Sequence, residues 1–291
     1  MNTLAILLAL GASICWASVM VLVKVGLKRM DFVSFAAIRP LFALVFIVPY
    51  GLLTADFQFS GFDLVGIAVL GGFLDSFVGS LLFFIAIEKI SAHKATALST
   101  TAPFWGVIAA VLFLGERPQP IIYIAAILVV IGAYSLSIRR EEAFSSNHSA
   151  LPAFLALAAG ILWGVAETVP AKYCLNHGMT PVTYQLIAVA IAGVSWGLVA
   201  ILKSRKHRLH YPWGGLKIAL LTAFLSFVLG WILWLTGLKL APASLLAPIH
   251  GSMTLFAFLF SILLLRERPS ARSIAGAILV FGGVFLVSIL G

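Results

Sequence analysis

The stretch "AAGILWGVAETVPAKY" (158–173) has a counterpart earlier in the chain, "GASICWASVMVLVKV" (11–25). In both stretches, small and branched residues precede a tryptophan, and a lysine follows eight or nine residues later. Trp16 matches Trp163 at an offset of 147. Because both stretches are almost entirely apolar, the match indicates a membrane helix that occurs twice in the fold.

Further matches extend this repeat along the chain. "LGERP" (114–118) agrees with "LRERP" (265–269), and "AILV" (126–129) recurs at 277–280, both at an offset of 151. Agreement at several places is poorly explained by coincidence. The sequence therefore indicates one unit of about 140 residues that is present twice.

The composition places both units in a membrane. Of the 291 residues, 62% are hydrophobic and 10% are charged, and the mean hydropathy is +1.11, which is too apolar for one soluble core. A helix crosses a bilayer core of roughly 30 Å with about 20 apolar residues. We predict an all-α integral membrane protein with ten transmembrane helices, near 4–27, 32–53, 64–87, 93–114, 120–138, 151–173, 181–202, 214–238, 242–265 and 271–290.

The two units are expected to have opposite orientations. A unit of five spans is odd, so its second copy enters the membrane from the other side, as in the inverted repeats of many secondary transporters. The domains are then a first repeat (1–138), a short cytoplasmic linker (139–150) and a second, inverted repeat (151–291). Because cytoplasmic loops hold the excess of lysine and arginine, as in "KSRKHR" (203–208), both termini are predicted to lie outside the cell membrane.

These basic loops also explain the net charge of +9. "KSRKHR" is compatible with nucleic-acid binding, but a short basic loop beside an anionic leaflet is the better interpretation. As partners we expect the lipid bilayer, a small-molecule substrate and a coupling proton, with no nucleic acid, and a monomer or weak homodimer. No cofactor and no metal are expected.

Ten spans in two inverted units, a tryptophan in the first span of each unit, and Glu-Arg-Pro at the end of each fourth span resemble the EamA family of the drug/metabolite transporter superfamily. The resemblance covers nearly the whole chain. It implies export of small metabolites, often amino acids, or of drugs. The related four-span multidrug transporters carry a proton-binding carboxylate eight residues before a lysine. This chain has Trp16 before Lys24 there, so that proton site is not carried over.

Polar and aromatic side chains inside the spans are the candidate substrate-binding residues, because a charge in lipid is costly unless it faces a cavity or a partner. The candidates are Trp16, Lys24, Arg39, Asp75, Thr101, Trp163, Glu167, Lys172, Trp231 and His250. The tryptophans among them, together with Trp234, lie away from the interfaces where tryptophan collects. They predict an aromatic-lined cavity for an amphipathic molecule, although plain packing is the alternative for any one of them.

Asp75 is the deepest charge, with Gly71 and Gly79 one turn away on the same face. Small neighbours let another helix approach closely or leave room for a ligand. The repeat partner of Asp75 is Ser226, so the fold does not need this charge twice. That asymmetry favours a functional role over a packed, satisfied aspartate.

Glu167, Pro170 and Lys172 stand together in the sixth span. Residues five apart lie about 140° apart on a regular helix, so Glu167 and Lys172 do not pair unless the helix bends. Proline removes a helix hydrogen bond and bends its segment, which predicts a bend beside a hydrated cavity. The alternative is that Glu167 forms an internal strut with Lys24 or Arg39.

The other candidates allow two interpretations each. Lys24 and Lys172 lie near span ends, where a lysine reaches the interface at little cost. Arg39 is suited equally to binding a carboxylate and to a structural contact. His250 lies in "PIHG" (248–251), which suits a broken helix, and it is either a proton or ligand site or a helix-to-helix hydrogen bond. Its matching stretch in the fourth span supplies Thr101.

We predict a secondary carrier that works by alternating access, with one five-span unit rocking against the other. Amino acids or related amphipathic compounds are the expected exported substrates. The chain has no ATP-binding motif and no H-E-x-x-H metal motif, so a membrane-embedded enzyme is less favoured. A lipid or lipid-headgroup flippase shares the repeat design and is the alternative.

Reporter fusions test the predicted topology. Fusions after Arg140 and Arg208 should both report the cytoplasm, and a fusion at Gly291 should report the outside, because the basic loops stay on the cytoplasmic side. Reporters that are active on one side of the membrane make this measurement. Opposite results at Arg140 and Arg208 would contradict the span count, whereas uniform reversal would overturn only the orientation.

Overall fold

The computed structural model describes residues 3–58, 61–90, 92–137, 150–205, 209–265 and 270–290, and every regular element within them is a helix. The first half contains α1 (Thr3–Gly26), α2 (Phe32–Thr54), α3 (Phe62–Gly72), η1 (Phe73–Gly79), α4 (Ser80–Ile87), α5 (Ala92–Ser99), α6 (Ala102–Leu114) and α7 (Pro120–Ser137). The second half contains α8 (Ala150–Ala166), α9 (Val169–Asn176), α10 (Pro181–Ser204), α11 (Trp213–Ala223), η2 (Phe224–Gly230), α12 (Trp231–Leu240), α13 (Ala243–His250), α14 (Ser252–Leu265) and α15 (Ala271–Leu290).

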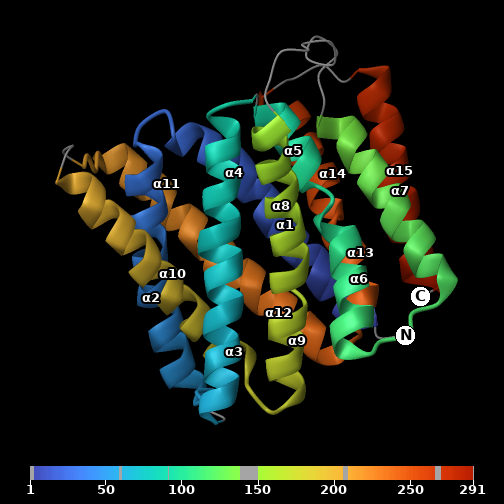
Figure 1. Cartoon of the computed structure of the whole chain (residues 1–291), viewed down its shortest axis with the longest axis horizontal. Coiled ribbons are helices and arrows are strands. Elements are labelled where there is room, and N and C mark those ends of the chain that lie inside the picture. Colours follow the sequence, from blue (N-terminus) through green and yellow to red (C-terminus); the bar gives the residue numbers. More distant parts are fainter. Residues whose placement is uncertain are drawn as a thin grey trace.

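These helices confirm the predicted spans. Within the described residues, nine helical stretches are long and apolar enough to cross a membrane, and Pro120–Leu136 is a shorter tenth. α1 begins and α15 ends at one end of the molecule, whereas α1 ends and α8 begins at the opposite end (Figure 1). We call the latter the basic end, because Lys28 and Arg29 follow α1 there. The linker 139–150 lies almost entirely outside the described residues, and which end faces the cytoplasm stays a prediction.

Spans 3 and 8 share an irregularity that the sequence did not predict. η1 and η2 are π-helical turns of seven residues at matching positions of the two repeats. Because a π-helix pairs residues five apart, carbonyl groups beside it lose their usual intrahelical partner. Side chains of span 7 take that place: Trp196 Nε1 donates to Ser76 O (2.9 Å), and Gln185 Nε2 donates to Phe227 O (2.8 Å).

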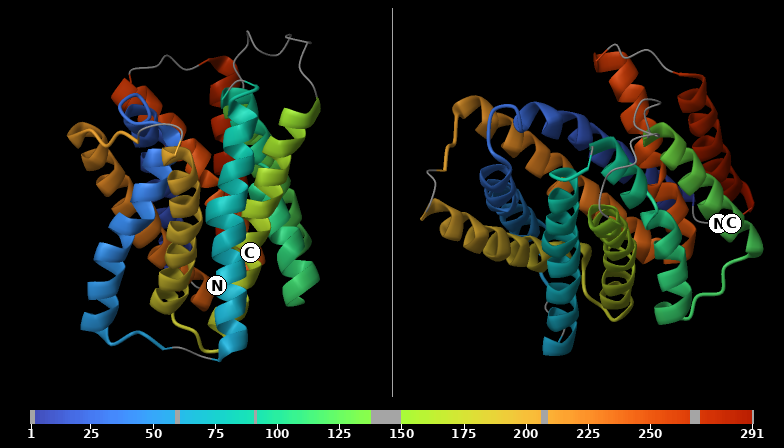
Figure 2. Two further views of the ribbon diagram at one scale, coloured as in Figure 1. Left: turned by 60° about the vertical axis from the view of Figure 1, so that its left-hand side comes forward. Right: turned by 45° about the horizontal axis from the view of Figure 1, so that its top comes forward.

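The two repeats interlock and do not form separate bodies. α1 packs against η2, α12, α13 and α14 of the second half, and α8 packs against η1, α4, α5 and α6 of the first half. α7 and α15 lie side by side (Figure 2), and a Cβ atom on Gly132 would lie 2.6 Å from the Gly276 oxygen. Rocking one whole unit against the other would break these contacts. The predicted rocking of one repeat against the other would therefore rearrange packed helix contacts, and it stays a prediction.

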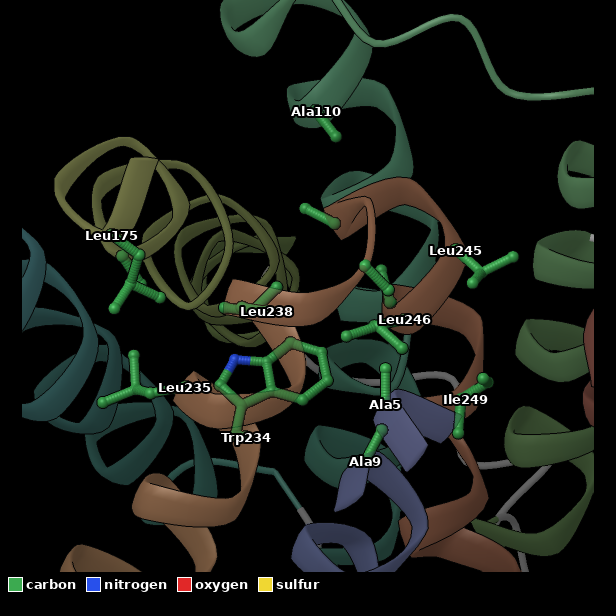
Figure 3. Packing of buried hydrophobic residues seen from close by; sticks show 14 of the residues in the cluster. Ala5, Ala9, Ala110, Leu175, Trp234, Leu235, Leu238, Leu245, Leu246 and Ile249 are labelled. Carbon is green, nitrogen blue, oxygen red and sulfur yellow. The ribbon is translucent and has the colours of Figure 1, made fainter. Parts of the chain in front are cut away.

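An apolar cluster around Trp234 anchors α1 in the second repeat (Figure 3). The fully buried indole of Trp234 lies near Ala5 and Ala9 of α1 and Leu246 of α13. Small residues keep the helices close: a Cβ atom on Gly237 of α12 would lie 3.3 Å from the Ala5 oxygen. The first helix is thus held by contacts far away in the sequence.

Glu116, from the Glu-Arg-Pro motif, links span 4 to span 9 at the end opposite the basic end. Its Oε1 accepts a hydrogen bond from Ala243 N and its Oε2 accepts one from Ser244 N, both at 2.8 Å. These two residues begin α13, whose N-cap residue Pro242 makes no side-chain capping bond. A carboxylate at a helix N-terminus satisfies free N–H groups and complements the helix dipole. The matching Glu267 lies outside the described residues.

Glu116→Gln should lower the free energy of unfolding by about 1–3 kcal/mol, because it weakens charge-assisted hydrogen bonds to the start of α13. Glu88→Gln is the matched control, since Glu88 is exposed at the end of α4 and should change stability by less than about 0.5 kcal/mol. Unfolding in detergent, followed by the helical circular dichroism signal, measures both variants. Equal effects would contradict the capping role.

Candidate functional site

Span 6 breaks at the predicted bend. α8 ends just before Glu167, and α9 begins at Val169 with Pro170 in its first turn. Proline has no N–H to donate, so the hydrogen-bond ladder of the helix is interrupted there. The break leaves the backbone oxygen of Glu167 free, and Trp234 Nε1 donates to it at 3.0 Å.

The Glu167 side chain meets His250 at the break of span 9. That break, at Gly251 between α13 and α14, confirms the predicted interruption. Glu167 Oε2 lies 3.1 Å from His250 Nδ1, with only 15% and 11% of these side chains exposed. Among the described residues, the ion-pair partner of Glu167 is therefore this histidine, and a strut to Lys24 or Arg39 is not formed.

Asp75 of η1 continues this contact. Its carboxyl group lies beside that of Glu167, and Ser76 Oγ donates to Asp75 Oδ2 at 2.7 Å. Ser76, Asp75, Glu167 and His250 therefore form a line of polar groups across spans 3, 6 and 9.

Aromatic rings enclose this line on two sides. The rings of Trp16 and Trp234 lie 4.7 and 5.2 Å from the His250 ring. On the other side, Trp163 Nε1 donates to the backbone oxygen of Asp75 at 3.1 Å. Aromatic rings thus lie beside the charged groups, and a cavity among them stays a prediction.

Trp16 and Trp163 occupy equivalent places in the two repeats. A Cβ atom on Gly230 would lie 3.1 Å from Trp16 Nε1, and one on Gly79 would lie 2.7 Å from Trp163 Nε1. These repeat-related glycines let each indole lie against the π-helical turn of the other repeat. Trp231 follows Gly230 directly, and its ring lies 5.9 Å from the Trp16 ring.

The structure places three other predicted residues away from Glu167. Thr101 lies at the break of span 4, where its hydroxyl donates to a backbone oxygen one turn earlier at 2.9 Å. Lys24 is exposed in the last turn of α1. Lys172 is buried, and its Nζ donates to the backbone oxygens of Leu238 and Ala241 at the end of α12. Lys172 thus caps a helix C-terminus.

Arg39 also lies apart from Glu167, in the half of the molecule near the basic end. Its Nη2 donates to Ser226 Oγ at 2.6 Å. Ser226 is the repeat partner of Asp75, so the π-helical turn of each repeat carries one polar side chain that contacts another span. The two turns differ in charge and in partner, although their backbones match.

Span 7 contributes residues that sequence reasoning missed. Tyr184 is 1% exposed, and its hydroxyl would lie 2.3 Å from a Cβ atom on Gly71, which confirms a close helix approach at that glycine. Trp196 and Gln185 satisfy the carbonyl groups of the π-helical turns. Span 7 has no charged side chain deep in the membrane. The polar atoms of these side chains in an otherwise apolar helix were therefore the only sequence feature that could have pointed to them.

Span 7 also contains "GVSWG" (193–197), which fits the letters G-x-S-x-G of serine hydrolases. That motif acts on a sharp turn between a strand and a helix. Here the stretch lies inside α10, and Ser195 is buried, so it is not a nucleophile elbow.

Among the described residues, no group of three or more His, Cys, Asp or Glu is arranged to hold a metal ion.

The sequence model of the EamA-like transporter family matches the chain twice, over residues 3–138 and 150–289. The chain belongs to the EamA-like transporter family. Two relatives from Archaeoglobus fulgidus, each called an uncharacterized transporter, are 26% and 22% identical to this EamA-like transporter. These alignments cover 98% and 99% of this chain and 98% of each relative.

A protein of known crystal structure shares the fold of this EamA-like transporter. The two have a TM-score of 0.85 with 16% sequence identity, over 100% of this chain and 98% of the other. The family match and the relatives named as transporters identify the EamA-like chain as a multi-pass membrane transporter.

The contact between Glu167 and His250 should give a measurable coupling energy. A double-mutant cycle of Glu167→Ala and His250→Ala is expected to yield about 1–3 kcal/mol, because the pair is largely buried. Unfolding in detergent supplies the four stabilities.

The exposed pair of Lys203 and Asp31 is the control, with 32% and 36% of the side chains exposed. Although partial burial acts to raise it, the pKa of Asp31 is lowered because Lys203 and Ser34 donate hydrogen bonds to its carboxylate. A cycle there should yield less than about 1 kcal/mol. Similar energies for the two pairs would contradict a special contact at the centre.

Proposed function

We propose that this EamA-like transporter is a secondary carrier that exports small amphipathic metabolites by alternating access, with amino acids and related compounds as the favoured class. The observation that carries the proposal is the meeting of Asp75, Glu167 and His250 from three different spans. Each of these spans is irregular at that point. Interrupted helices that hold ionisable side chains inside the membrane are typical of secondary transporter sites.

The surroundings suit a substrate with an amine and an apolar or aromatic side. Trp16, Trp163 and Trp234 offer flat apolar surfaces, and an ammonium group beside them gains both an ion pair and cation–π contacts. Glu167 is the natural partner of that ammonium. In the structure His250 takes this position, so the imidazole and a substrate amine compete for one carboxylate.

The same contacts support a coupling proton. The carboxyl groups of Asp75 and Glu167 lie side by side, and like charges at close range favour a proton on one of the two. A substrate ammonium close to Glu167 favours the ionised forms of both carboxyl groups and so promotes release of that proton. Exchange of a substrate cation for a proton is therefore the coupling that we propose.

A flippase is less well supported. Lipid transport requires a polar route that opens sideways to the bilayer. A hollow of about 280 Å³ does lie between α2 and α10, but the described residues that line it include no charged side chain. Two of them, Leu41 and Ile201, are at least half exposed, as expected for residues in contact with lipid tails.

Transport into proteoliposomes tests the proposed function. Wild-type protein should take up L-phenylalanine and phenylethylamine, and an acidic lumen should drive uptake, because protons leave as the substrate enters. Glu167→Gln should reduce uptake of both probes at least about 10-fold, since the amine loses its charged partner. Binding of uncharged 2-phenylethanol to the detergent-solubilised protein should stay within about 3-fold.

Glu88→Gln is the matched control, because it removes an exposed carboxylate at the end of α4 and should leave uptake unchanged. Undiminished uptake by Glu167→Gln would remove Glu167 from the site. Absence of wild-type uptake across amino acids, amines, sugars and nucleotides would contradict the proposed substrate class.

A further inference from the structure

A second polar feature lies in the half of the molecule near the basic end. A cavity of about 80 Å³ is bounded by spans 1, 2, 3, 7 and 8. Aromatic side chains, among them Phe32, Phe84 and Trp196, form much of its wall, and Ser76 and Arg39 also line it. Of the described residues in this wall, Arg39 alone carries a charge.

Arg39 has little compensation for its charge. Its single side-chain hydrogen bond goes to Ser226 Oγ, and its Nε is buried without a hydrogen-bond partner. The guanidinium carbon lies 5.0 and 5.6 Å from the ring centroids of Phe227 and Phe35. Within the described part of the chain, no carboxylate forms an ion pair with Arg39.

Such a cation needs an anion. A guanidinium inside the membrane is costly unless it is paired, and it binds a carboxylate through two parallel hydrogen bonds. The cavity beside Arg39 has room for a group of that size, since roughly 10–15 Å³ suffices for one water molecule. A ligand is therefore the natural source of the missing anion.

The second repeat has no equivalent of the Arg39 charge. The residues that correspond to Phe35, Arg39, Ser80 and Phe84 are Tyr184, Ala188, Trp231 and Leu235. All four are buried, with at most 6% exposure. An alanine thus stands where the first repeat has Arg39, and two large aromatic side chains, Tyr184 and Trp231, are buried at the other equivalent positions.

The cavity also adjoins the proposed amine site. Ser76 lines it, and the Ser76 hydroxyl donates to the Asp75 carboxyl group, which lies beside that of Glu167. Ser76 therefore connects the cavity that contains Arg39 to the acidic groups. That arrangement suits a molecule that carries both a carboxylate and an amine.

We propose that Arg39 binds the substrate carboxylate in this cavity, on the side of the basic end, so that a zwitterionic amino acid is bound more tightly than the corresponding simple amine. The inference rests on the proposed function. It adds a specificity-determining residue in span 2 that has no equivalent in the second repeat.

Three probes share one phenyl group and differ in charge. L-phenylalanine carries an amine and a carboxylate, phenylethylamine carries only the amine, and 3-phenylpropionate carries only the carboxylate. Their binding to the purified full-length protein in detergent is measured by calorimetry. Arg39→Gln should weaken binding of the two carboxylates about 10- to 100-fold and of phenylethylamine less than about 3-fold. Arg39→Lys keeps the charge without the planar fork and should give an intermediate loss.

Arg272→Gln is the matched control, because Arg272 is exposed at the start of α15 and should change no affinity. Ala36→Phe provides a second test that retains Arg39: it fills the cavity and should also weaken the carboxylates selectively. This variant decides the matter if Arg39→Gln does not fold.

Equal losses for all three probes in Arg39→Gln, or no loss for the carboxylates in Ala36→Phe, would overturn the inference. In either case, continued uptake of phenylethylamine in proteoliposomes would leave the proposed function intact. Failure of the wild type to bind any of the three probes would overturn both.

Discussion

Backbone carbonyl groups inside the membrane constrain this fold, because lipid offers no donor to a carbonyl that leaves its helix ladder. Each irregular turn at the centre frees such a group, and a side chain from another span binds it. The side-chain N–H groups donate hydrogen bonds to these oxygens in four pairs: Trp163 to Asp75 O, Trp196 to Ser76 O, Trp234 to Glu167 O and Gln185 to Phe227 O. The central tryptophans therefore hold the irregular turns in place as well as lining the site, and substituting one affects both.

The two repeats share their irregular backbone geometry but differ in their charged side chains. Both repeats place a π-helical turn and a glycine-packed tryptophan at matching positions, so the irregular architecture belongs to the repeat. The charges do not repeat: Asp75 corresponds to Ser226, and Arg39 corresponds to Ala188. Because folding does not require each charge twice, the unmatched charges are where substrate chemistry is best sought.

The sequence predicted what depends on local composition. Apolar run lengths gave the ten helices, and Pro170 and the Pro248–Gly251 stretch gave the breaks of spans 6 and 9. The π-helical turns carry no proline and follow from packing across the repeats, so local rules did not reveal them. The contact partners of the buried polar side chains could not be predicted from the sequence either. The contact of Glu167 with His250, and that of Lys172 with backbone oxygens, depend on how distant spans pack together.

The interlocked repeats also bear on how the proposed carrier changes state. Trp16 lies against Gly230 and Trp163 lies against Gly79, so the same contact exists in both halves. A cavity lies beside Phe84, whereas its counterpart Leu235 is fully buried. In an inverted repeat, exchanging the conformations of the two halves opens the opposite end with nearly the same set of contacts. Two such states of the proposed carrier would differ little in free energy, so that binding of substrate or of the proposed coupling proton would suffice to shift the balance between them.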